Sequence, residues 1–157
     1  MNQLRVVPVP PERLVTIRTS GRDDLDNPLA EWVAHGWEPL RCCLRTARAG
    51  ESLALIAYSP FAERSAWSEV GPVFIHLGDC AGYDRSGELP ADLRTGPRVL
   101  RTYHPDGSIA YDDITLVGPG EDVEPALTQL LSRPHIAWVH VRAQLSQCFT
   151  YEVRRAG

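Results

Sequence analysis

Two segments near the end of the chain alternate between apolar and polar side chains. Successive side chains of a strand point to opposite faces of the sheet, so this alternation predicts two strands, each with one apolar face. The apolar positions are Ala137, Val139 and Val141 in the first segment and Phe149, Tyr151 and Val153 in the second. If residues 143–147 form the loop between them, both apolar sets fall on the same face of a β-hairpin, and this agreement supports the register.

The opposite face of this hairpin is polar. In the same register Arg142 lies opposite Cys148, and His140 lies opposite Thr150. Diagonal neighbours on a sheet lie about 7–8 Å apart, so His140 and Cys148 are expected to come close. The polar face is predicted to carry Trp138, His140, Arg142, Cys148, Thr150 and Glu152.

The rest of the chain shows shorter patterns of both kinds. Asn27 and Pro28 are typical of a helix start and Gly36 of a helix end, so a short helix is predicted between them. Apolar residues from Val123 to Leu131 recur at helical spacing and predict a second helix. Runs rich in β-branched and aromatic residues predict strands at 13–18, 53–58, 73–77, 99–103 and 109–117.

Together these elements predict an α+β fold. We expect a largely antiparallel sheet of about six strands, with two helices packed on its apolar face. A length of 157 residues suits one domain, so 1–157 is interpreted as a single domain. Prolines 8, 10 and 11 predict an extended lead-in over residues 1–12, and residues 78–97 are expected to form a long surface loop.

Composition narrows the class of function. The net charge is −4 and no basic stripe is present, which argues against a nucleic-acid partner. No run reaches the roughly 18 apolar residues of a membrane span, so no membrane partner is expected. We expect a cytoplasmic location. All 16 basic residues are arginines, which excludes chemistry that needs a lysine amine of the protein itself. No cofactor is predicted.

Several motifs resemble those of a bacterial family known as domain of unknown function 1203. The resemblance runs from about residue 39 to 154, and it implies no activity. It rests on the order and spacing of Pro39-Leu40-Arg41, Ala47-Arg48-Ala49-Gly50-Glu51, Gly71-Pro72-Val73-Phe74, Leu100-Arg101-Thr102-Tyr103, Val139-His140-Val141 and Cys148-Phe149. The chain departs from the family pattern at Leu40, Arg142, Ala143 and Gln147, whereas Arg101, His140 and Cys148 match it.

Cys148 and His140 are the candidate catalytic residues. A cysteine that faces an arginine is expected to have a lowered pKa and a larger thiolate fraction, which makes Cys148 a candidate nucleophile and His140 its base. The structural alternative is that the polar face meets water, that Arg142 pairs with Glu152 and that Cys148 is inert. Of the two interpretations, this structural alternative is favoured over a catalytic role.

No metal site is predicted. His76, Cys80, His140 and Cys148 form a nominal set of zinc ligands, but they lack the closely spaced pairs that are typical of structural zinc sites. Cys42 and Cys43 are adjacent, so their side chains diverge if the segment is extended, and they do not form a C-x-x-C redox pair. In a cytosolic chain these four cysteines are expected to be thiols, ligands or core residues rather than disulfides.

The arginines suggest a third kind of site. Arginine binds carboxylates and phosphates through two parallel hydrogen bonds, so convergent arginines would form a pocket for a small anion. The candidate ligand-binding residues are Arg41, Arg101, Tyr103, Arg142 and His76. The leading hypothesis is a domain that binds a small anionic ligand through arginines and His140. The alternatives are an enzyme that uses His140 with the Cys148 thiolate, and an interaction module that uses Trp138 and the proline-rich lead-in.

Overall fold

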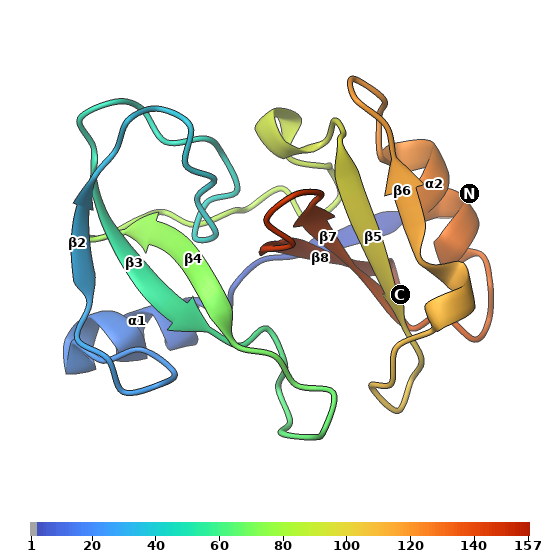
Figure 1. The fold of residues 1–157 in the computed structure, drawn as a ribbon, viewed down its shortest axis with the longest axis horizontal. Coiled ribbons are helices and arrows are strands. Elements are labelled where there is room, and N and C mark those ends of the chain that lie inside the picture. Colours follow the sequence, from blue (N-terminus) through green and yellow to red (C-terminus); the bar gives the residue numbers. More distant parts are fainter. Residues whose placement is uncertain (1–2) are drawn as a thin grey trace. The chain divides into compact units, whose positions relative to one another are not determined.

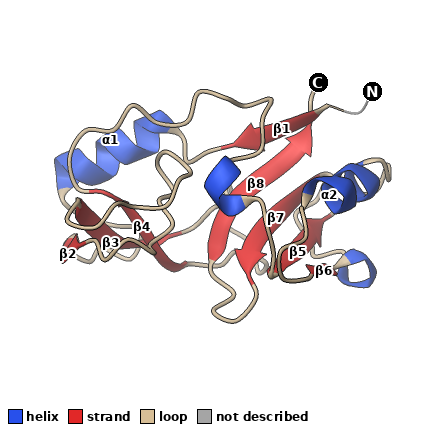
Figure 2. Cartoon of the chain, turned by 90° about the horizontal axis from the view of Figure 1, so that it is seen from above, coloured by secondary structure: helices blue, strands red, loops and turns tan. Residues whose placement is uncertain are grey.

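The computed structural model describes residues 3–157. It is an α+β fold with mostly antiparallel sheets, as predicted, but the strands form two sheets instead of one (Figures 1 and 2). The chain divides into two compact units. The described residues of unit 1 are 3–7 and Asp84–Gly157, and unit 2 is Pro8–Tyr83. None of the helices in residues 3–157 has the length and apolar character needed to cross a membrane.

Unit 1 is built on a five-stranded sheet in the order β1-β8-β7-β5-β6, with antiparallel neighbours throughout. Its helix, α2 (Glu124–Leu131), packs against β7 and β8 through buried leucines, as its helical spacing predicts. Short 3₁₀ turns occur at η1 (Ala91–Leu93) and η2 (Tyr111–Asp113). The strands are β1 (Leu4–Val7), β5 (Arg98–Tyr103), β6 (Thr115–Val117), β7 (Trp138–Ala143) and β8 (Phe149–Arg155).

The closing hairpin is confirmed as β7 and β8, but its predicted register is wrong by two residues. His140 pairs with Glu152 rather than Thr150. A shift of two residues keeps each side chain on its face, so the apolar pattern alone could not distinguish the two registers. A bulge between Val141 and Arg142 then moves Phe149 to the His140 face, where the two rings lie 4.9 Å apart.

Unit 2 contains a three-stranded antiparallel sheet in the order β2-β3-β4, together with helix α1 (Figure 1). The strands β3 (Ser52–Tyr58) and β4 (Gly71–His76) agree with the predicted runs. Their buried faces include Leu53, Ile56 and Ile75. Arg18 near the end of α1 donates hydrogen bonds to the carbonyl oxygen of His76, which joins the helix to the end of β4.

Two predicted elements in unit 2 are wrong. Residues 13–18 belong to helix α1 (Pro11–Ser20), because Pro11 begins the helix and Gly21 ends it with a positive φ, and these signals outweigh the β-rich composition. The helix predicted between Asn27 and Gly36 is strand β2 (Ala30–Val33). Pairing with β3 and the contact between Trp32 and Phe74, whose rings lie 5.3 Å apart, outweigh the local helix signals.

The predicted lead-in over residues 1–12 is partly replaced by regular structure. Leu4–Val7 is extended, but it is paired with β8 as strand β1, and α1 already begins at Pro11. Residues 1 and 2 of the predicted lead-in lie outside the described residues. The interpretation of 1–157 as one domain stays a prediction.

Candidate metal centre

A cluster of three cysteines and one histidine lies in unit 2. The four ligand atoms, one each from Cys42, Cys43, His76 and Cys80, all lie within 4.8 Å of one another. All four residues belong to unit 2. His76 ends β4 and Cys80 follows in the next loop, whereas Cys42 and Cys43 lie in a turn before β3. We call these four residues the thiol cluster.

The turn explains why two adjacent cysteines face the same place. Residues 41–43 are in a turn rather than a strand, and the turn is closed by a backbone hydrogen bond from Leu44 to Leu40. Leu44 has a positive φ of 56°, which reverses the chain direction within a few residues. The expected divergence of the two side chains holds only for an extended segment, and this segment is not extended.

The turn is fixed against the end of β4. The backbone N–H of Arg41 donates to the carbonyl oxygen of Phe74, and the backbone N–H of His76 donates to the sulfur of Cys42 at 3.3 Å. Cys42 is only 1% exposed, whereas Cys43 and Cys80 are half-buried. The cluster therefore has one buried side and one side that solvent can reach.

The distances among the ligand atoms of Cys42, Cys43 and His76 are close to those of a tetrahedral metal site, and the sulfur of Cys80 lies within 4.8 Å of all three. Ligands of a tetrahedral zinc ion, with Zn–S near 2.3 Å and Zn–N near 2.0–2.1 Å, lie about 3.8 Å apart for two sulfurs and about 3.6 Å apart for sulfur and nitrogen. The two sulfurs of Cys42 and Cys43 lie 4.0 Å apart. Nδ1 of His76 lies 3.5 Å from the sulfur of Cys42 and 3.9 Å from that of Cys43.

The other ring nitrogen of His76 faces a carboxylate. Nε2 of His76 lies 2.8 Å from Oε2 of Glu51, and β3–β4 pairing brings these residues together because Glu51 immediately precedes β3. Histidines that bind metals usually donate their second N–H to a carboxylate or carbonyl, which orients the ring. A proton on Nε2, donated to Glu51, would leave the lone pair of Nδ1 directed at the thiol cluster; Nη2 of Arg45 also lies 3.2 Å from Nε2.

Arg45 contacts Glu51 in turn, and these two residues form an outer layer around the four candidate ligands. Its guanidinium donates to both carboxylate oxygens of Glu51, at 2.9 and 2.8 Å. These hydrogen bonds and the backbone N–H of Arg48 hold the pKa of Glu51 well below its usual range. Glu51 is therefore an anion at neutral pH, which suits it to orient His76.

The three thiols differ in how readily they ionise. A hydrogen bond with Cys43, together with burial, raises the pKa of Cys42, and burial also raises the pKa of Cys80. The hydrogen bond with Cys42 lowers the pKa of Cys43, and the charge of Arg45 acts in the same direction. A metal cation would compensate the negative charge of all three thiolates.

The predicted ligand-binding and catalytic residues are divided between the units. Arg41 and His76 belong to unit 2, whereas Arg101, Tyr103, His140, Arg142 and Cys148 belong to unit 1. Of the nominal zinc set, His76 and Cys80 belong to the thiol cluster, whereas His140 and Cys148 do not. Sequence analysis missed Cys42, Cys43 and Glu51. The available signal was the Cys-Cys pair between Leu40 and Leu44, followed later by His76-x₃-Cys80.

In unit 1 most of the polar face of the hairpin is buried, contrary to the structural alternative in which it meets water, and only Trp138 and Cys148 of the residues assigned to it are half-buried. His140 is 0% exposed, and its Nε2 lies 2.9 Å from Oε1 of Glu152. Burial acts to raise the pKa of Glu152, but the hydrogen bond and charge of His140 hold it below its usual value. Arg154 donates to the same carboxylate and lies over the ring of Trp138.

The other candidates on this face make local contacts. Tyr103 stacks on Trp138 with ring centroids 5.5 Å apart, and Arg142 donates through Nε to the carbonyl oxygen of Gln147. Arg101 lies opposite His140 in the β5–β7 register. Cys148 precedes β8 and its sulfur contacts the carbonyl oxygen of Ser146 at 3.8 Å.

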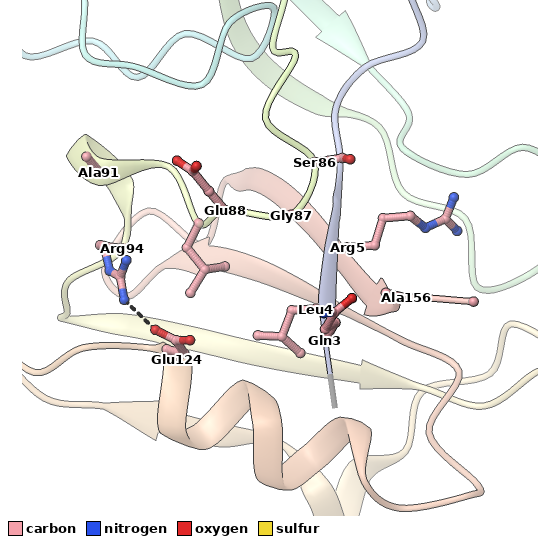
Figure 3. A pocket seen from close by; sticks show the side chains of 12 residues that line it. Gln3, Leu4, Arg5, Ser86, Gly87, Glu88, Ala91, Arg94, Glu124 and Ala156 are labelled. Carbon is pink, nitrogen blue, oxygen red and sulfur yellow. Dashed lines mark hydrogen bonds and ion pairs between the residues drawn. The ribbon is translucent and has the colours of Figure 1, made fainter. Parts of the chain in front are cut away.

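Unit 1 also has an open hollow of about 850 Å³ at β1 and η1 (Figure 3). Leu4, Arg5, Ser86 and Arg94 contribute to its walls. Arg94 forms ion pairs with Asp122 and Glu124, each at 2.7 Å, so carboxylates of the protein already compensate its charge. None of the candidate residues predicted from the sequence is among the described residues that line this hollow.

The thiol cluster lies within the part of the chain that matches a known protein family. A family model described as "Protein of unknown function (DUF1203)" matches residues 37–155, which agrees with the resemblance seen in the sequence. The matched region includes all four residues of the cluster and Glu51. No curated protein and no solved structure gives a significant match.

Proposed function

The chain belongs to this DUF1203 family, and we propose that it is a metal-binding protein that holds one zinc ion at the thiol cluster. The observation that supports the proposal most strongly is the convergence of four ligand atoms within 4.8 Å. Three thiolates and one imidazole are ligands that zinc accepts in four-coordinate structural sites. The ion would be held by Cys42, Cys43, Cys80 and Nδ1 of His76.

The ligand set determines the class of metal. Soft thiolate sulfurs favour zinc or other thiophilic ions over magnesium and calcium, which prefer oxygen ligands. Four protein ligands would fill a tetrahedral coordination sphere and leave no position for a substrate. The proposed role of the ion is therefore to stabilise unit 2 by joining the 41–45 turn to the end of β4, rather than to catalyse a reaction.

The contacts around His76 support the same proposal. Its Nε2 meets the Glu51 carboxylate at 2.8 Å, and Arg45 holds that carboxylate with two hydrogen bonds. Such an outer layer orients a ligating histidine and increases its basicity. Arg45 also supplies a positive charge close to a centre whose three thiolates and one zinc ion sum to −1.

Metal analysis of the purified protein tests the proposal. The chain, prepared without a histidine tag, is expected to contain about one zinc ion per molecule and to lose thermal stability when a chelator removes it. The Cys148→Ser variant is the matched control, because it removes a cysteine outside the cluster, and it should retain the metal. Protein that neither contains zinc nor gains stability when zinc is added would contradict the proposal.

The anionic-ligand hypothesis stays a prediction. Thermal shifts in a screen of carboxylates and phosphates, abolished in Arg101→Ala or Arg142→Ala, would support it, and a flat screen would oppose it. The enzyme hypothesis also stays a prediction, and it requires Cys148 to react with iodoacetamide faster than free cysteine near neutral pH. The interaction-module hypothesis stays a prediction as well, and a partner pull-down with a Trp138→Ala control tests it.

A further inference from the structure

We propose that the thiol cluster is also a site of reversible oxidation, at which a disulfide between Cys43 and Cys80 releases the metal. This inference rests on the proposed zinc site. It starts from the different exposure of the three cysteines, because Cys42 is 1% exposed while Cys43 and Cys80 are half-buried. An oxidant in solution can therefore reach Cys43 and Cys80 more readily than Cys42.

Cys43 is the thiol at which oxidation would begin. It is half-buried, whereas the neighbouring Cys42 is 1% exposed. Oxidation by peroxides proceeds through the thiolate, so an accessible thiolate is oxidised before a buried one. Zinc binding keeps the sulfur deprotonated until the oxidant arrives.

Cys80 is better placed than Cys42 to complete the disulfide. A bond between the neighbouring residues Cys42 and Cys43 would close an eight-membered ring around their peptide bond, which strains the planar trans geometry. Cys80 lies in a loop between Gly78 and Gly82, within 4.8 Å of the other ligand atoms. A small shift of this loop brings the two sulfurs to bonding distance.

The reaction with hydrogen peroxide is balanced in two steps. The Cys43 thiolate attacks one peroxide oxygen, so that an S–O bond forms, the O–O bond breaks, and the departing hydroxide takes a proton to become water. The Cys80 thiolate then attacks the sulfur of this sulfenic acid, so that an S–S bond forms, the S–O bond breaks, and the departing hydroxide takes a proton from solvent to become a second water. Two thiolates are oxidised by two electrons in total, and the peroxide is reduced.

The metal is lost because the disulfide removes two of its ligands. Disulfide sulfurs bind zinc poorly, since the thiolate is the ligand. Cys42 and His76 alone would hold the ion much more weakly than the full set. Reduction of the disulfide by a dithiol would restore both thiolates and allow zinc to bind again.

Peptide mapping distinguishes the possible bonds, because the chain has no lysine and trypsin cuts it only after arginine. Cys42 and Cys43 fall together in peptide 42–45, Cys80 falls in peptide 65–85, and Cys148 falls in peptide 143–154. The proposed disulfide links peptide 42–45 to peptide 65–85. A bond between the neighbouring cysteines would leave peptide 42–45 unlinked and two hydrogens lighter.

The experiment treats zinc-loaded protein with increasing hydrogen peroxide and measures released zinc, free thiols and tryptic peptides together. We expect about one zinc ion to be released for each link between peptides 42–45 and 65–85, while Cys148 stays reduced. Zinc should bind again after treatment with dithiothreitol. Cys80→Ser should form no link, and Cys148→Ser should behave as the parent. Oxidation of Cys148 before the cluster, a bond within peptide 42–45, or irreversible loss of the thiols would overturn the inference.

This experiment distinguishes a failure of the oxidation step from a failure of zinc binding. The metal content is measured before peroxide is added, so a protein without zinc refutes the metal site and leaves the peptide map to report on the disulfide. A protein that contains zinc and keeps it while peroxide oxidises other residues refutes only the oxidation step. Because the wild-type protein provides the peptide map, the test does not depend on the folding of any variant.

Discussion

Nε2 of His76 lies 2.8 Å from Oε2 of Glu51, while Nδ1 of the same ring lies 3.5 Å from the sulfur of Cys42. One nitrogen therefore faces a carboxylate and the other faces thiols. A histidine that donates through one nitrogen to an anion presents the lone pair of the other to a metal. The proposed zinc site in unit 2 depends on this arrangement.

Replacing Glu51 by glutamine should weaken zinc binding without removing a ligand. The amide keeps the shape of the side chain but loses the charge that orients His76 and strengthens it as a ligand. We expect affinity to fall by about 10- to 100-fold. A competition titration with a coloured zinc chelator measures it.

Glu88→Gln is the matched control for this variant, because Glu88 is an exposed glutamate paired with Arg85 on the surface of unit 1. It should bind zinc as the parent does. Equal affinities of Glu51→Gln and Glu88→Gln would show that the carboxylate plays no part at the centre.

Serine substitutions should divide the four cysteines into two groups. Cys42→Ser, Cys43→Ser and Cys80→Ser each remove a thiolate ligand, so each should lower the zinc content and the stability gained from zinc. Cys148→Ser lies outside the cluster and should change neither. Metal analysis and thermal unfolding with and without added zinc measure both effects, and a loss of zinc in Cys148→Ser would be inconsistent with a zinc site at the thiol cluster.

Glu38 should make the stability of unit 2 dependent on pH. This carboxylate is fully buried and accepts hydrogen bonds from Trp32 and from the backbone of His35, Gly36 and Trp37. Burial acts to raise its pKa, but these hydrogen bonds lower it from 4.5 to about 2. A lowered pKa in the folded state stabilises the fold above the unfolded pKa, and this contribution is lost as the pH falls from about 4.5 to about 2.

The Glu38→Gln variant tests this dependence. At pH 7 it should be less stable than the parent by about 2–3 kcal/mol, because it lacks the charge that the four donors stabilise. The difference should shrink as the pH approaches 3. The free energy of unfolding at several pH values measures it, with Glu63→Gln as an exposed control. A difference that is constant from pH 7 to pH 3 would contradict the assignment.

The buried pair in unit 1 should be structural. His140→Leu leaves the Glu152 carboxylate without its buried partner but still paired with Arg154, so the cost should be below the about 3–5 kcal/mol of a buried charge left with no partner. Replacing Glu152 by leucine as well removes the buried carboxylate, and Arg154 can then turn to solvent, so the double variant should recover part of the stability. Chemical denaturation of the parent, His140→Leu, Glu152→Leu and the double variant measures the coupling. Equal stability of His140→Leu and the parent would refute this role.

The sequence was informative where a local pattern and the tertiary structure agree. The leucines of α2 recur at helical spacing, and the alternation of Val139 and Val141 marks a strand, so both elements were predicted correctly. The register of β7 and β8 was wrong because a shift of two residues preserves every face, and because a bulge is not visible in the pattern. Pairing with β3 determined the structure of β2 although its local signals predicted a helix.

The thiol cluster was missed for a related reason. His76 and Cys80 were recognised as potential ligands, but their partners depend on a turn at residues 41–43 and on contacts between segments more than 30 residues apart. Spacing along the chain does not show such proximity. Glu51 could not be assigned to His76 before the β3–β4 pairing was known.

X-ray absorption at the zinc edge identifies the atoms that hold the metal. A zinc ion at the thiol cluster should show a first coordination shell of about three sulfurs near 2.3 Å and one nitrogen near 2.0 Å, with the sulfur count reduced in Cys43→Ser and unchanged in Cys148→Ser. A shell composed only of oxygen and nitrogen, or a protein that takes up no zinc to measure, would contradict the proposed zinc site.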